Sequence, residues 1–400
     1  MTRARWRQAL HGAALMLAGS ASLPARLAGQ AASADPRFGD VRAYLEGAVA
    51  RGAFPGAVLV VGLKGREVYR TAVGVYGEDD PRPVSDSTVY DLASLTKVIG
   101  LTTATMLLVA DGRLELDAPV QRYVPEFQGT GKDQVTVRHL LLHASGLPAW
   151  RPLYQEASDA AGARALADTT PLEAPPGTRY TYSDLGAIVL TQAVERLAAR
   201  RLDSVLADQV FGPLGMRRTR FLPPAEWLPL VAPTERDPWR GRVLHGEVHD
   251  ENAARLGGVS GHAGLFSTGP DLARFAFWLL DAYHGRLRPD AVPRLPASTV
   301  RAFLTRANQP AGSTRALGWD TPAPEGGSSG HCLAPTSFGH TGFTGTSIWI
   351  DPERDLVIIL LTNRVHPTRE NQLIRDVRPA VADRVVRAVA GAAACPLVDR

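Results

Sequence analysis

Strand-forming runs stand near both ends of this 400-residue chain, and the long middle part reads as helices joined by loops. Residues 57–62 and 67–74 predict a hairpin around a Lys-Gly-Arg turn. Residues 346–350 and 356–362 predict a second hairpin around an Asp-Pro-Glu-Arg turn. Strands from both termini favour an α/β (α+β) fold, in which an antiparallel sheet carries an inserted, mostly helical lobe. A cleft between the two parts is the natural place for a site.

Helical periodicity predicts a helix at each end of the chain, over 35–51 and 369–391, and these two helices are expected to flank the sheet. We therefore expect a single domain over residues 35–395. Its sheet lobe is assigned to 35–90 and 310–395, and its helical lobe to 91–309.

Residues 1–34 have the three parts of a secretory signal peptide: a basic start, an apolar stretch and small residues that suit cleavage. This segment holds four arginines and no acidic residue, so it carries the whole formal charge of +4. We expect export to the periplasm or the extracellular space, no nucleic-acid partner and no membrane span in the mature chain. A helical or disordered N-terminus and a retained anchor are the alternatives. The sequence does not indicate the oligomeric state.

Cys332 and Cys395 are the two cysteines of the chain. Their spacing matches no metal or redox motif, and a disulfide in an oxidising compartment is compatible with them. The sequence alone leaves the pairing open.

Ser94 and Lys97 stand three residues apart at the start of the helical run 91–112, which places both side chains on one face of a helix. The chain has three lysines against 41 arginines. A lysine chosen at this place suggests a need for an amine that can lose a proton, because arginine cannot. The alternative is a solvated lysine on a helix surface.

Tyr182 precedes a second helix, within Tyr180-Thr-Tyr182-Ser183-Asp184. Ser183 or Asp184 could serve only as a helix cap, and the tyrosine could serve only in packing. The functional interpretation makes Tyr182 a general base or proton shuttle. A phenol that ionises near neutrality needs its pKa lowered by roughly 3 units, about 4 kcal/mol, and the field of Lys97 could supply much of this.

A third motif, the glycine-rich segment 339–346, leads directly into a late strand. Glycines at a strand edge let another backbone approach closely. A substrate acyl group could therefore dock there, with the N–H groups of Phe343 and Ser94 as an oxyanion hole. The alternative is a plain glycine-rich turn.

The three motifs together, in this order, resemble the serine β-lactamase and penicillin-binding-protein superfamily, with its S-x-x-K, Y-x-N and K-T-G motifs. The class C-like branch is the nearest in pattern, and the resemblance runs from about residue 40 to 390. It implies a β-lactamase/transpeptidase-like fold, an acyl-enzyme on Ser94, and Lys97 and Tyr182 as proton-handling groups. It implies no cofactor and no metal. Which of Lys97 and Tyr182 is the base stays open.

The same resemblance places Asp184, His340, Thr341 and Gly342 in the substrate-binding region with Phe343. Two of these depart from the pattern, since Asp184 stands for the usual Asn and His340 for the usual Lys. We expect His340 to be partly charged near neutrality and so to attract a substrate carboxylate weakly. Both departures favour a peptidase or esterase over an efficient β-lactamase, and His340→Lys is expected to change substrate preference.

The predicted function is thus hydrolysis of an amide or ester, with a small molecule or a peptidoglycan peptide ending in D-Ala as substrate. The alternatives are an esterase or weak β-lactamase of the same family, and a β-lactam-binding module that does not turn over. A metal site built from His245, His249 and His262 is disfavoured, because glycines interrupt any helix there and spacing fixes no third ligand. An α/β-hydrolase is disfavoured, because the stretch Gly258-Val-Ser260-Gly261-His262 lacks the last glycine of a G-x-S-x-G motif.

Overall fold

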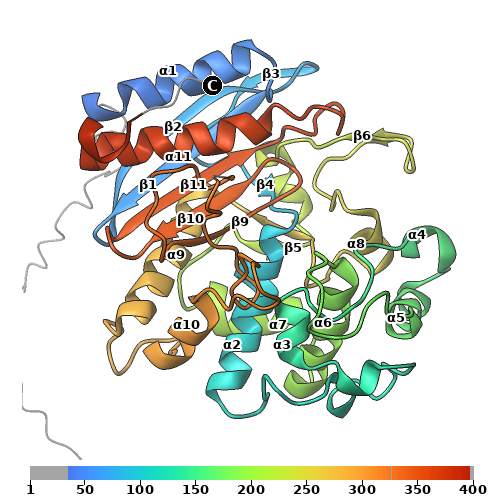
Figure 1. The fold of residues 1–400 in the computed structure, drawn as a ribbon. Coiled ribbons are helices and arrows are strands. Elements are labelled where there is room, and N and C mark those ends of the chain that lie inside the picture. The colour runs from blue at the N-terminus through green and yellow to red at the C-terminus, as the bar shows by residue number, and fades with distance from the viewer. Residues whose placement is uncertain (1–34, 326, 397–400) are drawn as a thin grey trace, which may run out of the picture.

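The computed structural model describes residues 35–325 and 327–396, and the expected signal peptide at 1–34 lies outside them. Figure 1 shows a sheet sandwiched between the two terminal helices on one face and the helical part of the chain on the other. The predicted fold class, an antiparallel sheet from both ends of the chain with a large helical insertion, is confirmed.

The main sheet has six strands in the order β3-β2-β1-β11-β10-β9. All of its pairings are antiparallel, and β1 and β11 join the two ends of the chain at its centre, with Ala57 opposite Thr362. The strands are β1 (Gly56–Leu63), β2 (Arg66–Gly77), β3 (Asp80–Pro83), β9 (Phe338–Thr341), β10 (Ser347–Asp351) and β11 (Leu356–Thr362).

Strand β1 is an almost continuous apolar run because both faces of the sheet are covered. Its side chains alternate between two hydrophobic cores. Leu59 and Val61 pack in the core that includes residues of α1 (Gly39–Ala50) and α11 (Ile374–Ala390). Val58 and Val60 face the opposite core, which includes residues of α9 (Gly269–His284) and much of the helical lobe. The sheet therefore fixes the position of the helical lobe.

The helical lobe also carries two small sheets, β4-β8-β5 and β6-β7. Besides α9, its longer helices are α2 (Thr103–Ala110), α5 (Ala160–Thr169), α6 (Asp184–Ala198) and α10 (Ala297–Leu304). Its short helices are α3 (Val137–Leu141), α4 (Leu153–Glu156), α7 (Leu202–Leu206) and α8 (Glu251–Arg255). Its short strands are β4 (Tyr90–Asp91), β5 (Arg220–Phe221), β6 (Arg236–Asp237), β7 (Arg242–Val243) and β8 (Leu265–Ser267). Short helical turns complete the chain at η2 (Pro36–Phe38), η3 (Lys97–Thr102), η4 (Val120–Arg122), η5 (Lys132–Gln134), η6 (Ala207–Phe211), η7 (Ala225–Leu230) and η8 (Ala392–Ala394).

The closing helix begins five residues later than the expected start at 369, because side chains of the preceding loop bind elsewhere. Arg369 pairs with Glu235 of the helical lobe at 2.5 Å. The amide of Asn371 donates to the carbonyl of Gly52 at 2.6 Å. These contacts tie the loop to two other parts of the molecule and delay the helix.

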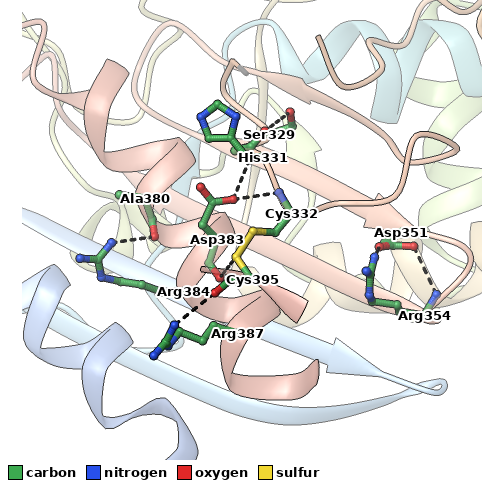
Figure 2. The surroundings of a disulfide bond; sticks show 11 residues. Ser329, His331, Cys332, Asp351, Arg354, Ala380, Asp383, Arg384, Arg387 and Cys395 are labelled. Atoms are coloured by element: carbon green, nitrogen blue, oxygen red, sulfur yellow. Dashed lines mark hydrogen bonds and ion pairs between the residues drawn. A yellow bond between two sulfur atoms is a disulfide. The ribbon is translucent and has the colours of Figure 1, made fainter. Parts of the chain in front are cut away.

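A disulfide joins Cys332, in the loop before β9, to Cys395 after α11 (Figure 2). Asp383 of α11 lies beside it and accepts hydrogen bonds from the backbone amides of His331 and Cys332, at 2.7 and 3.1 Å. The bridge therefore fastens the end of the chain to the loop that leads into the edge strand. Within the described residues, no helix has the length and apolar character needed to span a membrane.

Candidate active site

The turn that carries Ser94 is held by a buried aspartate rather than by regular helix. The Asp91 carboxylate accepts the backbone N–H of Ala93 at 2.8 Å and that of His249 at 2.7 Å. Ala93 has a φ of +45°, a left-handed conformation that a non-glycine residue adopts at a cost of about 1–3 kcal/mol. The expected helix over 91–112 thus starts only after this strained turn, and its first full turns are the wide π-helical turns of η3.

The ammonium of Lys97 has two hydrogen-bond acceptors and one carboxylate around it. It donates to Ser94 Oγ and to the carbonyl of His262, both at 3.1 Å. Its third neighbour is the Asp184 carboxylate, with Nζ and Oδ1 2.6 Å apart. Burial alone would favour the neutral amine, but attraction by Asp184 and Tyr182 raises the pKa of Lys97 above its usual range. The lysine is therefore an ammonium, paired with Asp184.

Tyr182 is placed by the start of α6. Ser183 caps that helix by accepting the N–H of Gly186 at 3.2 Å, and its own N–H donates to His143 Nδ1 at 3.1 Å. The imidazole of His143 lies 4.5 Å from the Tyr182 ring, measured between centroids. Lys97 Nζ is 4.9 Å from the centroid of the same ring. His143 lies outside the three sequence motifs, and the structure makes it the support of Tyr182.

The turn between β9 and β10 is pinned to the Ser94 turn by threonines. Thr344 Oγ1 donates to the carbonyl of Asp91 at 2.7 Å, and Thr346 Oγ1 to that of Leu92 at 3.1 Å. A Cβ on Gly342 would lie 2.3 Å from the Leu92 carbonyl oxygen, so only glycine permits this approach. In the described part of the chain, the backbone N–H groups of Ser94 and Phe343 have no protein acceptor. Both amides are available to a ligand.

His340 is neutral, which corrects the expectation of partial charge. Burial, with the charges of Arg315 and Lys97, lowers the pKa of His340 well below its usual range. Its Nδ1 lies 2.8 Å from the carbonyl oxygen of Thr341, which can only accept, so Nδ1 carries the proton. Nε2 is therefore an acceptor, and it is buried without a hydrogen-bond partner among the described residues.

A cavity of about 330 Å³ opens beside Ser94, and four arginines line it. We call it the arginine-side cavity, and its cations are Arg315, Arg364, Arg375 and Arg378. Arg378 donates to the carbonyls of Gly342 and Thr346, at 2.6 and 2.9 Å. Burial and the charge of Arg364 lower the pKa of Arg378. Such a group gains from an anion placed next to it.

Arg315 is the arginine of this cavity that contacts the rings of Tyr180 and Tyr182. Its Nε donates to the hydroxyl of Tyr180 at 3.1 Å, and its guanidinium carbon lies 5.2 Å from the centroid of the Tyr182 ring. One terminal nitrogen, Nη1, is buried and has no partner among the described residues. Sequence reasoning missed this residue, because no motif surrounds it.

On the other side of Ser94 lies a cavity of about 240 Å³, the acidic-side cavity. It is lined by the carboxylates of Asp184, Asp250 and Glu251 and by two half-exposed aromatic rings, Trp150 and Phe343. Glu251 is paired with Arg369 at 2.7 Å. Ser94 thus stands between a cationic pocket and an acidic, aromatic one.

Comparison with known proteins agrees with this arrangement. The family described as Beta-lactamase matches residues 41–382, which is most of the chain. The chain belongs to the Beta-lactamase family.

Relatives and solved structures agree with this family. A "Putative D-alanyl-D-alanine carboxypeptidase" of Escherichia coli (strain K12) is 32% identical over 350 residues, covering 78% of this chain and 79% of that protein. The solved penicillin-binding-protein homologue from Caulobacter crescentus has a TM-score of 0.71 at 20% identity and covers 89% of this chain and 98% of its own. A solved mutant of a class C β-lactamase has a TM-score of 0.70 at 20% identity, covering 89% of this chain and 99% of its own. The two structures share the fold, and the protein is a serine hydrolase of this family.

Within the β-lactamase family's pattern, the two unusual positions are now placed. Asp184, which stands for the usual Asn, is an ion-pair partner of Lys97. His340, which stands for the usual Lys, is neutral. The positive charge comes instead from the arginine-side cavity, where two arginines lie in loops and two in α11. Thr341 also lines the arginine-side cavity.

The three histidines weighed as metal ligands have separate partners. The ring of His245 contacts the carbonyl of Val231, that of His249 contacts Glu235, and that of His262 contacts Asp250. Within the described residues, the one group spaced like metal ligands is Cys332, Asp383 and Cys395, and its two sulfurs form the disulfide.

Proposed function

We propose that the protein is an exported D-alanyl-D-alanine carboxypeptidase-type hydrolase that works through an acyl-enzyme on Ser94. One observation carries the proposal. The Ser94 hydroxyl is hydrogen-bonded to the Lys97 ammonium at the junction of two cavities, and unpaired backbone amides lie at the same place.

In the proposed acylation step, Ser94 Oγ attacks the substrate carbonyl carbon and forms a C–O bond. Its proton passes to Tyr182 or Lys97 and then to the leaving amine as the C–N bond breaks. Water next attacks the ester, returns a proton to Ser94 and releases the acid. Because Lys97 holds its full set of protons beside Asp184, it accepts the Ser94 proton only after giving one up, and Tyr182 accepts it only as a phenolate.

The oxyanion formed in both steps would be stabilised by the N–H groups of Ser94 and Phe343. Each such donor contributes about 2.7–4 kcal/mol to transition-state stabilisation in comparable hydrolases. The threonine contacts that join the two turns would hold these donors in register before the substrate arrives.

The arginine-side cavity supports a substrate with a carboxylate on the leaving-group side, as in a peptide that ends in D-Ala. Arg375 and Arg378 would bind this carboxylate, and His340 would offer Nε2 as an acceptor to an N–H of the substrate. The name of the relative from Escherichia coli points to the same substrate class.

A second candidate is an esterase, a weak β-lactamase or a β-lactam-binding module that turns over slowly. The pairing of Asp184 with Lys97 favours it, because a carboxylate stands where an amide donor would hold the substrate. A long-lived adduct would be the sign of the binding module.

Export is proposed from the signal-like segment 1–34, and the disulfide supports it because such bridges persist in oxidising compartments. We further propose that 35–395 acts as one catalytic domain. N-terminal sequencing of the protein recovered from the cell exterior or periplasm would test the cleavage.

The deciding experiment combines two substrates with the Ser94→Ala variant. Intact-mass measurement with a reporter-labelled penicillin should show one adduct on the wild type and none on the variant. A peptide ending in D-Ala-D-Ala should release D-alanine only with the wild type. Cleavage of a nitrophenyl ester without D-alanine release would select the esterase, and activity that survives in Ser94→Ala would overturn the proposal.

A further inference from the structure

A hydrogen-bonded chain of a hydroxyl, an imidazole and a carboxylate lies next to Lys97. Ser260 Oγ is 2.7 Å from His262 Nδ1, and His262 Nε2 is 2.8 Å from Asp250 Oδ1. The order resembles a nucleophilic triad, but Ser260 is only 2% exposed, so a substrate carbonyl does not reach its hydroxyl. The Ser260–His262–Asp250 chain therefore has a role other than direct attack on a substrate.

The backbone of the same histidine contacts the reactive lysine. The side chain of His262 takes part in the Ser260–Asp250 chain, while its carbonyl accepts a hydrogen bond from Lys97 Nζ at 3.1 Å. The loop is also held at the preceding residue, since the N–H of Gly261 donates to Thr191 Oγ1 at 3.0 Å. A Cβ on Gly261 would lie 2.3 Å from that oxygen, so the loop is closely packed.

We propose that Asp250, His262 and Ser260 act as positioning residues that hold the His262 carbonyl against Lys97 and so aim its ammonium at Ser94. The inference rests on the proposed acylation of Ser94. His262 is buried, and both of its ring nitrogens are hydrogen-bonded, Nδ1 to Ser260 and Nε2 to Asp250. Its backbone therefore cannot turn away from Lys97 without breaking one of these bonds. A displacement of about 1 Å at a reacting group costs on the order of 100-fold in rate.

Asp250 makes two contacts that different substitutions can separate. It caps α8 by accepting the N–H of Ala253 at 2.7 Å, and it binds His262. Asp250→Ser keeps a good helix cap but is too short to reach the imidazole. Asp250→Asn keeps both the cap and an oxygen that can accept from His262 Nε2.

The measurement is stopped-flow acylation by a reporter-labelled penicillin, resolved into a binding constant and an acylation rate constant, together with the thermal midpoint. Asp250→Ser should lower the acylation rate constant about 10- to 100-fold, and Asp250→Asn should restore it to within a few-fold. Ser260→Ala, which removes one end of the chain, should have a smaller effect of the same kind and serves if Asp250→Ser does not fold.

The outcomes separate this inference from the proposed function. Without a Ser94 adduct on the wild type, the proposed function fails. With normal acylation of the wild type, an unchanged rate in both Asp250→Ser and Ser260→Ala overturns the positioning role. Equal losses in Asp250→Ser and Asp250→Asn, both folded, would assign the effect to the charge of Asp250 and overturn it too. An adduct on Ser260 would make the chain a second nucleophile and would also overturn the positioning role.

Discussion

At the residue scale, the proposed function separates the charge that would bind substrate from the groups that would move protons. Lys97 is hydrogen-bonded to Ser94 and His262 and ion-paired with Asp184, which holds it as a charged and oriented group. His340 is neutral and offers a lone pair. Attraction for an anionic substrate must then come from the arginine-side cavity.

Arg375 provides a direct test of that attraction. Its side chain is exposed on the wall of the arginine-side cavity. We expect Arg375→Ala to raise KM for a peptide with a free terminal carboxylate about threefold to tenfold, roughly 1 kcal/mol, since a partly exposed ion pair contributes this much. KM for an uncharged nitrophenyl ester should stay the same, and an equal rise for both substrates would contradict a carboxylate subsite.

His340→Lys is the complementary change, because it adds a cation where the wild type has none. The ratio of kcat/KM values for carboxylate-bearing and neutral substrates should rise about tenfold, about 1.4 kcal/mol. His340→Gln is the control, since it is neutral like the imidazole and should keep the wild-type ratio. An unchanged ratio in His340→Lys would mean that the substrate anion lies elsewhere.

At the element scale, the edge strand β9 and the Ser94 turn act as one unit. Their contact depends on Gly342, whose missing side chain allows the two backbones to meet. We expect Gly342→Ala to lower kcat by at least about tenfold, because the Phe343 amide must move away from the oxyanion. Gly39→Ala is the matched control: a Cβ there meets nothing within 4 Å, and it should leave kcat unchanged. Similar kcat values for the two variants would exclude a need for close approach.

The disulfide is a separate element on the loop before β9 and the end of α11 (Figure 2). It encloses a long stretch of chain, with a sequence separation of 63, so its loss should cost about 2–5 kcal/mol of unfolding free energy. We expect Cys332→Ser with Cys395→Ser to lower the thermal midpoint and to leave kcat for the folded enzyme close to the wild type. A large loss of kcat at a temperature where the variant is fully folded would show that the bridge also shapes the site.

The sequence alone predicted those elements whose signal is local. Neighbouring residues alone determine the spacing of Ser94 and Lys97 and the late hairpin. The predicted late strand 356–362 matches β11. Arg315 and the neutral state of His340 could not be predicted, because each depends on residues far away in the chain. The helix start at 374 was also missed, since a pairing with Glu235 holds the preceding loop.

At the scale of the whole molecule, burial of neutral histidines links the site to stability. His143 and His340 are both buried, and burial together with Arg315 and Lys97 lowers both pKa values well below the usual range. In the unfolded chain a histidine binds a proton below about pH 6.5, whereas in the fold these two do not. The unfolded state then holds more protons, so each histidine lowers the unfolding free energy as the pH falls below about 6.5.

Other groups oppose this trend, so the prediction is made as a difference between two proteins. Burial raises the pKa of Asp168 to about 6, which adds stability as the pH falls through the same range. His340→Gln keeps the contribution of Asp168 to the unfolding free energy but lacks one buried histidine. We expect the unfolding free energy of His340→Gln relative to the wild type to rise by up to about 1.4 kcal/mol for each pH unit below about 6.5, and to be independent of pH above about 7.5. Denaturant unfolding of both proteins from about pH 5 to 8 measures this difference. A difference that is flat over the whole range would mean that His340 titrates normally in the fold, and the neutral acceptor assigned to its Nε2 would then be wrong.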